Sequence, residues 1–490
     1  MEHHSPLKKN AALNAVRQAC VIAFPFLTFA YATRVLGSEQ MGMHAFGQSV
    51  VSYFVSLAMM GIPDYAGREA SVLRDREEKL GKFVSEIVSI NLMTAAAAYG
   101  LLFLLLQIWG KLRPYRYIIL IQSTQMILTA AGTDWINTAF EDFLYPTVRY
   151  IVTGAGCIVA MLLLVKNESD LYAYTFLLML ASAGGNLWNI YHVRRYVKIK
   201  PALYLNVKQH LPPMLLFFIS GMALIIYLNS DLTVLGLLVD DRTVGIYAVS
   251  ARIYLMVKAL INALVMAAVP GLSWLAAAGQ TDRYRQKVSR LADGLLLLAV
   301  PAAAGMFSEA ENIIYFAAGS AYLEGTGVLK IYSAVLLPAV CSCLFSYAVL
   351  MPFHMEKYFT AVVIPAAALN IGLNFFLIPK LGMYGAAVTT LLAEAMVFAV
   401  TLYFATGKIN LRICRRDFLT ELAGGAVICG ICRAVQQLQL NPGIRLWLSI
   451  GMSAAGYCMA LFLMKNSVFL ELTGSIWKKG SSVRRRNWKE

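Results

Sequence analysis

The sequence predicts an all-α polytopic membrane protein with about fourteen transmembrane helices. Of its 490 residues, 59% are hydrophobic and only 14% are charged, whereas soluble domains carry about 25% charged residues. The mean hydropathy is +0.63. Apolar runs of about 20 residues, the length that crosses a bilayer, recur from one end of the chain to the other. No hydrophilic stretch between them is long enough to form a soluble domain.

Short polar segments between the apolar runs give the predicted helix boundaries. The predicted spans cover residues 12–36, 41–62, 83–108, 115–136, 147–165, 171–191, 212–238, 242–268, 291–307, 327–351, 357–378, 382–406, 418–438 and 444–464. We expect the first run to be a span of the mature protein, because it contains Arg17 and lacks a small-residue cleavage site. The C-x-x-C pair at Cys429 and Cys432 has neither a histidine nor a second pair with it, so we predict no metal site and no cofactor.

The segments between the spans differ strongly in positive charge. With a cytoplasmic N-terminus, the inner segments hold 29 of the 42 lysines and arginines and the outer segments hold 8. Since positive residues are enriched in cytoplasmic loops, we expect both termini in the cytoplasm. Basic juxtamembrane segments on anionic lipid explain the pI of 9.4 without a nucleic-acid partner. The polar stretch 63–82 is predicted to be an amphipathic interfacial helix.

A short motif occurs twice in the chain. VLG at 35–37 and VLG at 234–236 each end one span, and Gly42-x-x-Ala45 and Gly245-x-x-Ala248 each open the next. This match aligns spans one to six with spans seven to twelve, and parallel repeats with a site between the halves are a recognised transporter architecture. We predict two pseudo-symmetric six-helix bundles over 1–205 and 206–410, two extra transmembrane helices over 411–465 and a basic cytoplasmic tail over 466–490.

Two cations occupy the middle of the eighth predicted span. Arg252 and Lys258 lie where an ionisable side chain costs about 2.5–3.5 kcal/mol on insertion scales. The residues that share a helical face with Lys258 are Tyr247, Tyr254 and Asn262. Arg252 lies about 120° away from Lys258, so only a wide cavity receives both. Cations in such a cavity predict an anionic substrate group such as pyrophosphate, which arginine binds in bidentate fashion and lysine as a point charge.

Other polar residues inside the spans are further candidates. Asn14 and Arg17 belong to a polar stripe on the first span. Arg17 is near the inner end, so it either lines a cavity or snorkels to the headgroups. Glu394, in the middle of the twelfth span, either binds a coupling ion or proton or pairs with a cation, and Asp231 near the outer end of the seventh span is a second coupling candidate.

Two motifs carry a family resemblance. The first lies in "IYLNSDLTVLGLLVDDRTVGIYAVSARIY" and matches at Leu235, Gly236, Val244, Gly245, Tyr247, Ala251 and Arg252. The second matches at Asp134, Trp135, Glu141, Tyr145 and Arg149. Together with the opening "NAALNAVRQACVIAFPFLTFAYATRVLGSEQMG" and the span count, the chain resembles the Wzx-type polysaccharide flippases of the multidrug/oligosaccharidyl-lipid/polysaccharide exporter superfamily over nearly its whole length.

The resemblance implies a V-shaped pair of six-helix bundles that works by alternating access. It implies transfer of an undecaprenyl-pyrophosphate-linked oligosaccharide to the outer leaflet of a bacterial cytoplasmic membrane, for capsule, exopolysaccharide, O-antigen or teichoic-type polymers. It also implies coupling to H⁺ or Na⁺, cavity roles for Arg17 and Arg252, and a groove for the lipid tail beside spans thirteen and fourteen. The role of Lys258 rests on its position alone. We expect a monomer.

Three alternatives stay open. A multidrug exporter of the same superfamily would favour acidic cavity residues, whereas the central charges here lean cationic. The sequence does not distinguish a lipid II flippase from a flippase of other lipid-linked oligosaccharides. A membrane-bound oligosaccharide polymerase or ligase usually has a large outer loop, and the longest outer segment, about 308–326, contains no arginine, lysine or histidine. We therefore predict a transporter and not an enzyme.

Overall fold

The computed structural model describes residues 7–200, 206–353, 355–409, 414–471 and 473–474. Within these ranges all regular structure is helical and there is no strand. Each of the fourteen predicted spans falls on a helical segment, and eleven helices in the described part of the chain are long and apolar enough to cross a membrane. The predicted all-α polytopic membrane fold is confirmed.

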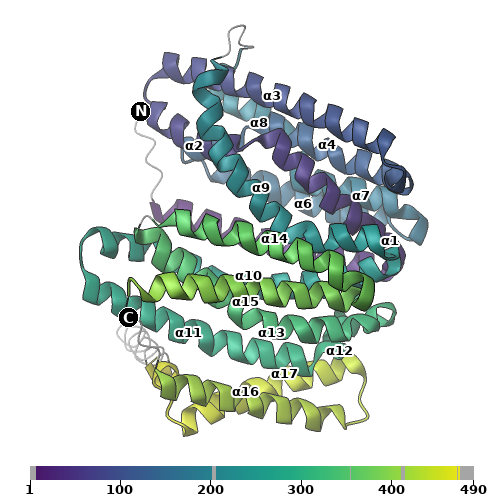
Figure 1. Cartoon of the computed structure of the whole chain (residues 1–490), viewed down its shortest axis with the longest axis vertical. Helices are drawn as coiled ribbons and strands as arrows, with labels where there is room; N and C mark the ends of the chain where they lie inside the picture. Colours follow the sequence, from purple (N-terminus) through teal and green to yellow (C-terminus); the bar gives the residue numbers. More distant parts are fainter. Residues whose placement is uncertain (1–6, 201–205, 354, 410–413, 472, 475–490) are drawn as a thin grey trace, which may run out of the picture. The chain divides into compact units, whose positions relative to one another are not determined.

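The chain divides into two compact units, residues 1–248 and 249–490. The first contains α1 (Leu7–Met59), α2 (Ile62–Leu73), α3 (Glu77–Ile108), α4 (Arg116–Gly132), α5 (Asp134–Ala139), α6 (Leu144–Leu164), α7 (Leu171–Met179), α8 (Asn186–His192) and α9 (Val207–Leu238). Helix α1 packs against α3, α4, α6 and α9, so it is the central helix of this unit (Figure 1). The predicted division into bundles after residue 205 stays a prediction.

A glycine separates the first two predicted spans within α1. Gly37 has φ 77° and ψ 174°, in the region that only glycine adopts at little cost. The chain therefore bends at the end of the first VLG motif and continues directly into a second helical half. The polar stretch 63–82 folds as α2 and the beginning of α3, and α2 buries Ile62, Tyr65, Ala66 and Ala70.

The two copies of the repeated motif meet each other in space. A Cβ atom on Gly42 would lie 1.7 Å from the carbonyl oxygen of Asp241, and one on Gly245 would lie 1.9 Å from that of Ser38. The second half of α1 and the beginning of α10 (Asp241–Ala277) thus pack backbone against backbone. Only glycine allows this approach, which is the physical reason for a glycine in both copies.

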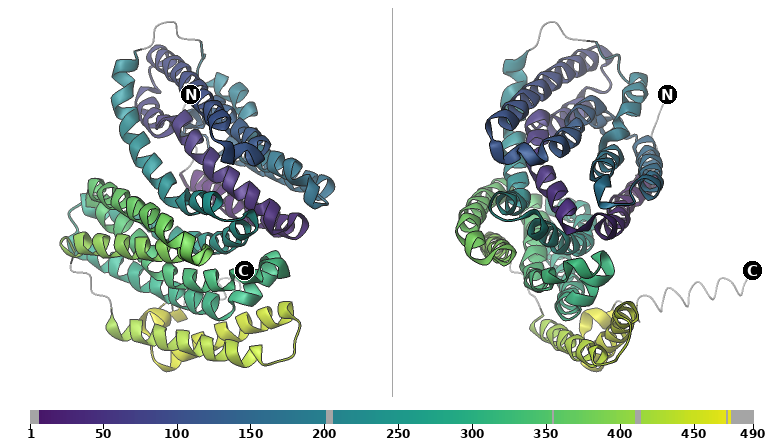
Figure 2. Two further views of the ribbon diagram at one scale, coloured as in Figure 1. Left: turned by 45° about the vertical axis from the view of Figure 1, so that its right-hand side comes forward. Right: turned by 90° about the vertical axis from the view of Figure 1, so that its right-hand side faces the viewer.

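The second unit contains the rest of α10 and a bundle to which the last two helices are attached. Its helices are α11 (Thr281–Ser308), α12 (Ala310–Ala318), α13 (Thr326–Cys343), α14 (Glu356–Leu381), α15 (Met383–Thr406), α16 (Arg415–Gln436) and α17 (Pro442–Leu463). Helix α15 packs against α13 and α14, and α11 packs against α13 and α16. Figure 2 shows α16 and α17 side by side as a hairpin. Most of the predicted basic tail, residues 475–490, lies outside the described residues.

Candidate functional site

A buried ion pair joins the middle of α10 to the middle of α15. Lys258 Nζ lies 2.6 Å from Glu394 Oε1, and the two side chains are 17% and 6% exposed. Of the two roles that the sequence left open for Glu394, the structure shows the pairing with a cation. The charge of Lys258 is therefore compensated inside the second unit.

Aromatic rings and unpartnered polar atoms surround this pair. Lys258 Nζ lies 5.7 Å from the centre of the Tyr254 ring, a cation–π geometry, and this ring stacks on Tyr332 at 4.6 Å. The Tyr254 hydroxyl and the Asn262 side-chain carbonyl oxygen are buried without a hydrogen-bond partner. Since buried polar atoms are normally hydrogen-bonded, these two atoms mark positions where a water molecule or a ligand group can supply the bond. We call Tyr254, Lys258, Asn262, Tyr332 and Glu394 the lysine cluster.

Arg252 is not part of the lysine cluster. Its side chain is exposed, whereas those of Ile253 and Tyr254 beside it are buried. The six-residue separation from Lys258 places the two cations on different faces of α10. Neither the role of Arg252 nor that of Lys258 in substrate binding is tested by this arrangement, and both stay predictions.

Tyr247 and Asp231 form a separate buried pair in the first unit. The Tyr247 hydroxyl donates to Asp231 Oδ2 at 2.8 Å, and the two residues are 1% and 8% exposed. Nearby on α9, the Thr233 hydroxyl lies 2.9 Å from that of Tyr53 on α1. The sequence predicts that Tyr247 and Tyr254 share one face of α10. Their partners, Asp231 and Tyr332, belong to different units.

Arg17 and Asn14 lie in the first half of α1. The Arg17 side chain is half-buried, and the side chain of Asn14 lies outside the described residues. Their place in a substrate cavity stays a prediction.

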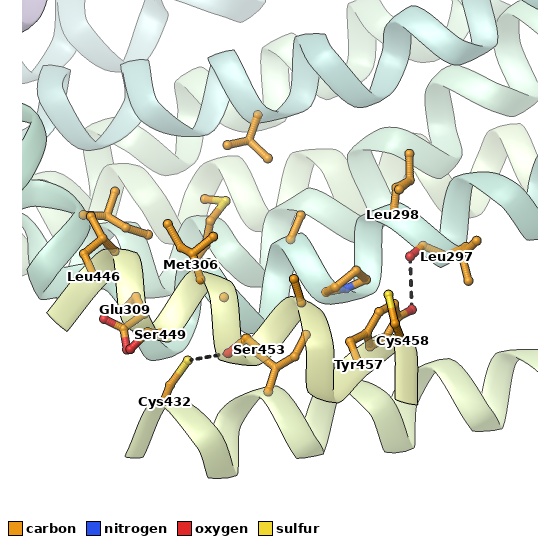
Figure 3. A pocket seen from close by; sticks show the side chains of 18 of the residues that line it. Leu297, Leu298, Met306, Glu309, Cys432, Leu446, Ser449, Ser453, Tyr457 and Cys458 are labelled. Atoms are coloured by element: carbon orange, nitrogen blue, oxygen red, sulfur yellow. Dashed lines mark hydrogen bonds between the residues drawn. The ribbon is translucent and has the colours of Figure 1, made fainter. Parts of the chain in front are cut away.

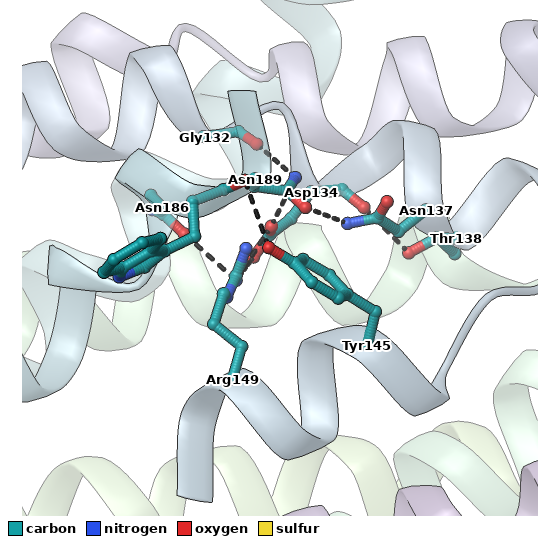
Figure 4. A network of polar contacts seen from close by, with 9 residues as sticks. Gly132, Asp134, Asn137, Thr138, Tyr145, Arg149, Asn186 and Asn189 are labelled. Carbon is teal, nitrogen blue, oxygen red and sulfur yellow. Dashed lines mark hydrogen bonds and ion pairs between the residues drawn. The ribbon is translucent and has the colours of Figure 1, made fainter. Parts of the chain in front are cut away.

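The second family motif forms a polar network in the first unit. Arg149 Nη2 on α6 donates to both carboxylate oxygens of Asp134, at 3.0 and 2.9 Å, and to Asn186 Oδ1 at 3.1 Å. Asn189 Nδ2 donates to Asp134 Oδ1 at 3.1 Å, and its Oδ1 accepts from Asn137 Nδ2 at 2.7 Å. Figure 4 shows these side chains converging from α5, α6 and α8. The motif therefore ties three helices together.

The remaining residues of this motif pack around the same network. Trp135 is buried in the core beneath α2 and α3, and the Tyr145 ring stacks on His192 with 3.6 Å between ring centres. Glu141 forms an ion pair with Arg74 at 3.2 Å. The motif thus stabilises this end of the first unit.

A buried histidine in the first unit is absent from the sequence-based candidates. His210 on α9 lies between two side chains: its Nδ1 is 2.8 Å from the Tyr65 hydroxyl, and its Nε2 is 3.0 Å from Glu86 Oε2. All three residues are buried. They are 145 and 124 residues apart, so no local spacing reveals them. The sequence did show that Glu86 lies near the start of the predicted span 83–108 and that His210 lies just before the predicted span 212–238.

An apolar groove of about 510 Å³ lies in the second unit between α11, α12, α16 and α17. Its walls include Leu297, Met306, Ile428 and Leu446. The Tyr457 hydroxyl, which also faces this groove, is already engaged as a donor to the Leu297 carbonyl oxygen at 3.0 Å (Figure 3). We call this cavity the hairpin groove. A concave surface with so few free polar groups suits a hydrocarbon chain.

Comparisons with known proteins agree with this architecture. Residues 7–275, more than half of the chain, match the family model described as polysaccharide biosynthesis protein. An Escherichia coli K12 protein named "Putative O-antigen transporter" is 22% identical over 416 residues, which cover 83% of this chain and 98% of the relative. A Shigella dysenteriae protein with the same name is 22% identical over 397 residues, with 80% and 98% covered.

Solved structures share the fold. The lipid II flippase MurJ in an inward closed conformation aligns with a TM-score of 0.77 at 15% identity and covers 93% of this chain and 98% of that chain. An inward-facing multidrug resistance MATE family transporter of the MOP superfamily aligns with a TM-score of 0.61 at 11% identity, with 80% and 97% covered. The family match, which agrees with the resemblance of the motifs, shows that this chain belongs to the polysaccharide biosynthesis protein family.

Proposed function

We propose that this protein is a flippase that moves an undecaprenyl-pyrophosphate-linked oligosaccharide from the inner to the outer leaflet of a bacterial cytoplasmic membrane. The family, the names of the O-antigen transporter relatives and the fold shared with a lipid II flippase support a lipid-linked polysaccharide precursor as the substrate. The observation that carries the proposal is the hairpin groove. A polyprenyl tail has to stay in an apolar environment while its polar head crosses, and this groove is apolar.

The head group would be held by the cations inside the spans. In this proposal Arg17, Arg252 and Lys258 bind the pyrophosphate, because phosphate oxygens accept charge-assisted hydrogen bonds from both cation types. The residues that would line the rest of the cavity are Asn14, Tyr247, Tyr254 and Asn262. Glu394 neutralises Lys258 at 2.6 Å, so the pyrophosphate would replace this carboxylate as the partner of the lysine when it binds.

Coupling to an ion gradient and the topology belong to the same proposal. Glu394 and Asp231 are candidate sites for H⁺ or Na⁺, because both carboxylates are buried within the helices. We place both termini in the cytoplasm on the basis of the Lys/Arg bias of the loops, and we propose alternating access by a monomer. The exported polymer would be a surface polysaccharide.

The test is a leaflet-transfer assay with the purified protein in liposomes. We expect transfer of a fluorescent undecaprenyl-pyrophosphate oligosaccharide, and at least a tenfold slower rate in Arg252→Ala, since about 1.4 kcal/mol of lost binding already corresponds to tenfold. Lys258→Ala and Arg17→Ala should also slow the transfer, and Arg252→Lys should lose less than Arg252→Ala. Arg68→Ala, at a side chain that is 73% exposed, is the matched control and should transfer normally.

The same liposomes separate the alternatives. Export of cationic dyes without lipid transfer would identify a multidrug exporter, and transfer restricted to lipid II would identify a lipid II flippase. Release of polymerised or ligated oligosaccharide would identify an enzyme. Normal transfer in both Arg252→Ala and Lys258→Ala would contradict the proposed pyrophosphate site.

A further inference from the structure

Glu421 on α16 is a buried acid that has no part in the proposed head-group site. The residue is 1% exposed, and both of its carboxylate oxygens are buried without a hydrogen-bond partner. Within the described ranges no lysine, arginine or histidine pairs with it. A charged carboxylate that is buried without a partner is strongly disfavoured, and such a group takes up a proton instead.

Among the residues that the structure describes, the charged groups that act on Glu421 are acidic. Asp417 lies one turn earlier on α16, and Asp293 comes from α11; both act on Glu421 as like charges. From α17, Tyr457 is the titratable neighbour, and its hydroxyl is already a donor to a backbone carbonyl oxygen. Asn466, which follows α17, gives its amide hydrogens to the Asp417 carbonyl oxygen and the Thr420 hydroxyl, at 3.3 and 2.9 Å. Of these groups, the Asn466 side chain favours the charged form of Glu421, but none of them carries a positive charge that could neutralise it.

The two neighbouring acids have donors of their own. Asp417 accepts from the Ser467 N–H at 2.9 Å and from the Ser467 hydroxyl, and Asp293 accepts from the N–H of Cys414. Hydrogen bonds to a carboxylate favour its charged form, so among the three acids Glu421 is the one best suited to hold a proton. In the described part of the chain no three His, Cys, Asp or Glu residues are arranged to hold a metal ion.

We propose that Glu421 is a proton-binding site, and that H⁺ is the ion coupled to transport. In the arrangement seen here the carboxyl group is protonated, and it releases its proton to water when α16 moves from α11 and water reaches it. This inference rests on the proposed function as a flippase. Glu394 and Asp231 are weaker candidates because Lys258 and Tyr247 already partner their carboxylates.

The position of Glu421 also links the proton to the hairpin groove. One turn further along α16, Gly424 packs so closely on Tyr457 that a Cβ there would lie 2.6 Å from the ring. Tyr457 in turn lines the groove. A lipid tail that displaces this ring therefore moves the turn of α16 that carries Glu421.

Infrared spectroscopy of the protein in lipid nanodiscs tests the site without any substrate. We expect the C=O stretch of a protonated carboxyl group at neutral pH, and its loss in Glu421→Gln. Glu78→Gln, at an exposed position, should leave the band unchanged. Glu421→Gln is nearly isosteric and neutral, so it should fold, and its helix content and thermal midpoint are measured in parallel. A band that survives Glu421→Gln would overturn the proton site.

Transport in liposomes tests the coupling. The wild-type protein should move lipid-linked oligosaccharide several-fold faster with an imposed pH gradient than without it. In Glu421→Gln the ratio of these two transfer rates should be near one, and Glu421→Asp should recover part of the wild-type ratio. A full response in Glu421→Gln would overturn the assignment. If the wild-type protein shows the infrared band but moves no lipid, the proposed function fails and the proton site stands.

Discussion

The ion pair between Lys258 and Glu394 allows a quantitative test. At 2.6 Å the attraction of two unit charges is about 6 kcal/mol at an effective dielectric constant of about 20, and the lost hydration of both groups offsets much of it. Removal of one partner leaves the other charge buried, which costs about 3–5 kcal/mol. Because the Lys258 side chain is still 17% exposed, we expect Glu394→Leu to lower the free energy of unfolding by about 3 kcal/mol, at the lower end of that range.

A double-mutant cycle measures the coupling. Lys258→Met should also destabilise the protein, whereas Lys258→Met combined with Glu394→Leu should lie within about 1 kcal/mol of the wild type, since apolar replacement of a buried pair is often neutral. Unfolding in mixed detergent micelles, followed by circular dichroism, gives the free energies. The exposed pair Arg290–Glu471, at 72% and 62% exposure, is the control, and Glu471→Ala should cost no more than about 1 kcal/mol. Additive losses in the double variant would refute the reasoning.

Two further predictions concern the first unit. Gly42→Ala places a methyl group 1.7 Å from the Asp241 carbonyl oxygen, where ordinary contact begins at 3.4 Å, so we expect a loss of at least about 1–3 kcal/mol of stability, measured as a lower thermal midpoint. Asp170 accepts hydrogen bonds from the backbone N–H groups of Lys166 and Asn167 at 2.8 and 3.0 Å, and these bonds hold the pKa of this carboxyl group below its usual value. The stabilisation by Asp170 is therefore fully present above the unfolded-state pKa of about 3.9 and is lost as the pH falls through the folded-state pKa. In thermal melts, the amount by which the midpoint of the wild type exceeds that of Asp170→Asn should therefore shrink below about pH 4.

Each of these predictions has a matched control. Gly156→Ala adds a methyl group where nothing lies within 4 Å and should not lower the thermal midpoint. An unchanged midpoint in Gly42→Ala would show that the close approach at the repeated motif does not exist. Asp75→Asn, at a side chain that is 94% exposed, should give a difference from the wild type that does not vary with pH. A wild-type advantage over Asp170→Asn that grows as the pH falls would contradict the sign of the effect.

The sequence was sufficient to predict the helices and their approximate ends. Hydrophobicity and run length are local properties, so each predicted span falls on a helical segment. The repeated glycines were also visible as a pattern. Their reciprocal backbone contact at Gly42 and Gly245 was not visible, because a pattern shows that a small residue occurs but not what lies beside it.

The division of the candidate site was also beyond the sequence. Helical periodicity predicts that Tyr247, Tyr254 and Lys258 share one face of α10, and the charge of Lys258 suggests a partner. It does not say that this partner is Glu394, 136 residues away, or that Tyr247 bonds to Asp231 instead.

The sequence by itself therefore determined the membrane class, the helix positions, the charge bias of the loops and the identity of the ionisable residues inside the spans. Only the tertiary structure decided which of these residues are paired, that both carboxylate oxygens of Glu421 are buried without a close hydrogen-bond partner, and where a groove forms. The reason is physical. Hydrophobic transfer and helix formation depend on one segment at a time, whereas contacts between apolar helices depend on the shape fit and hydrogen bonds of two surfaces that are distant in the chain.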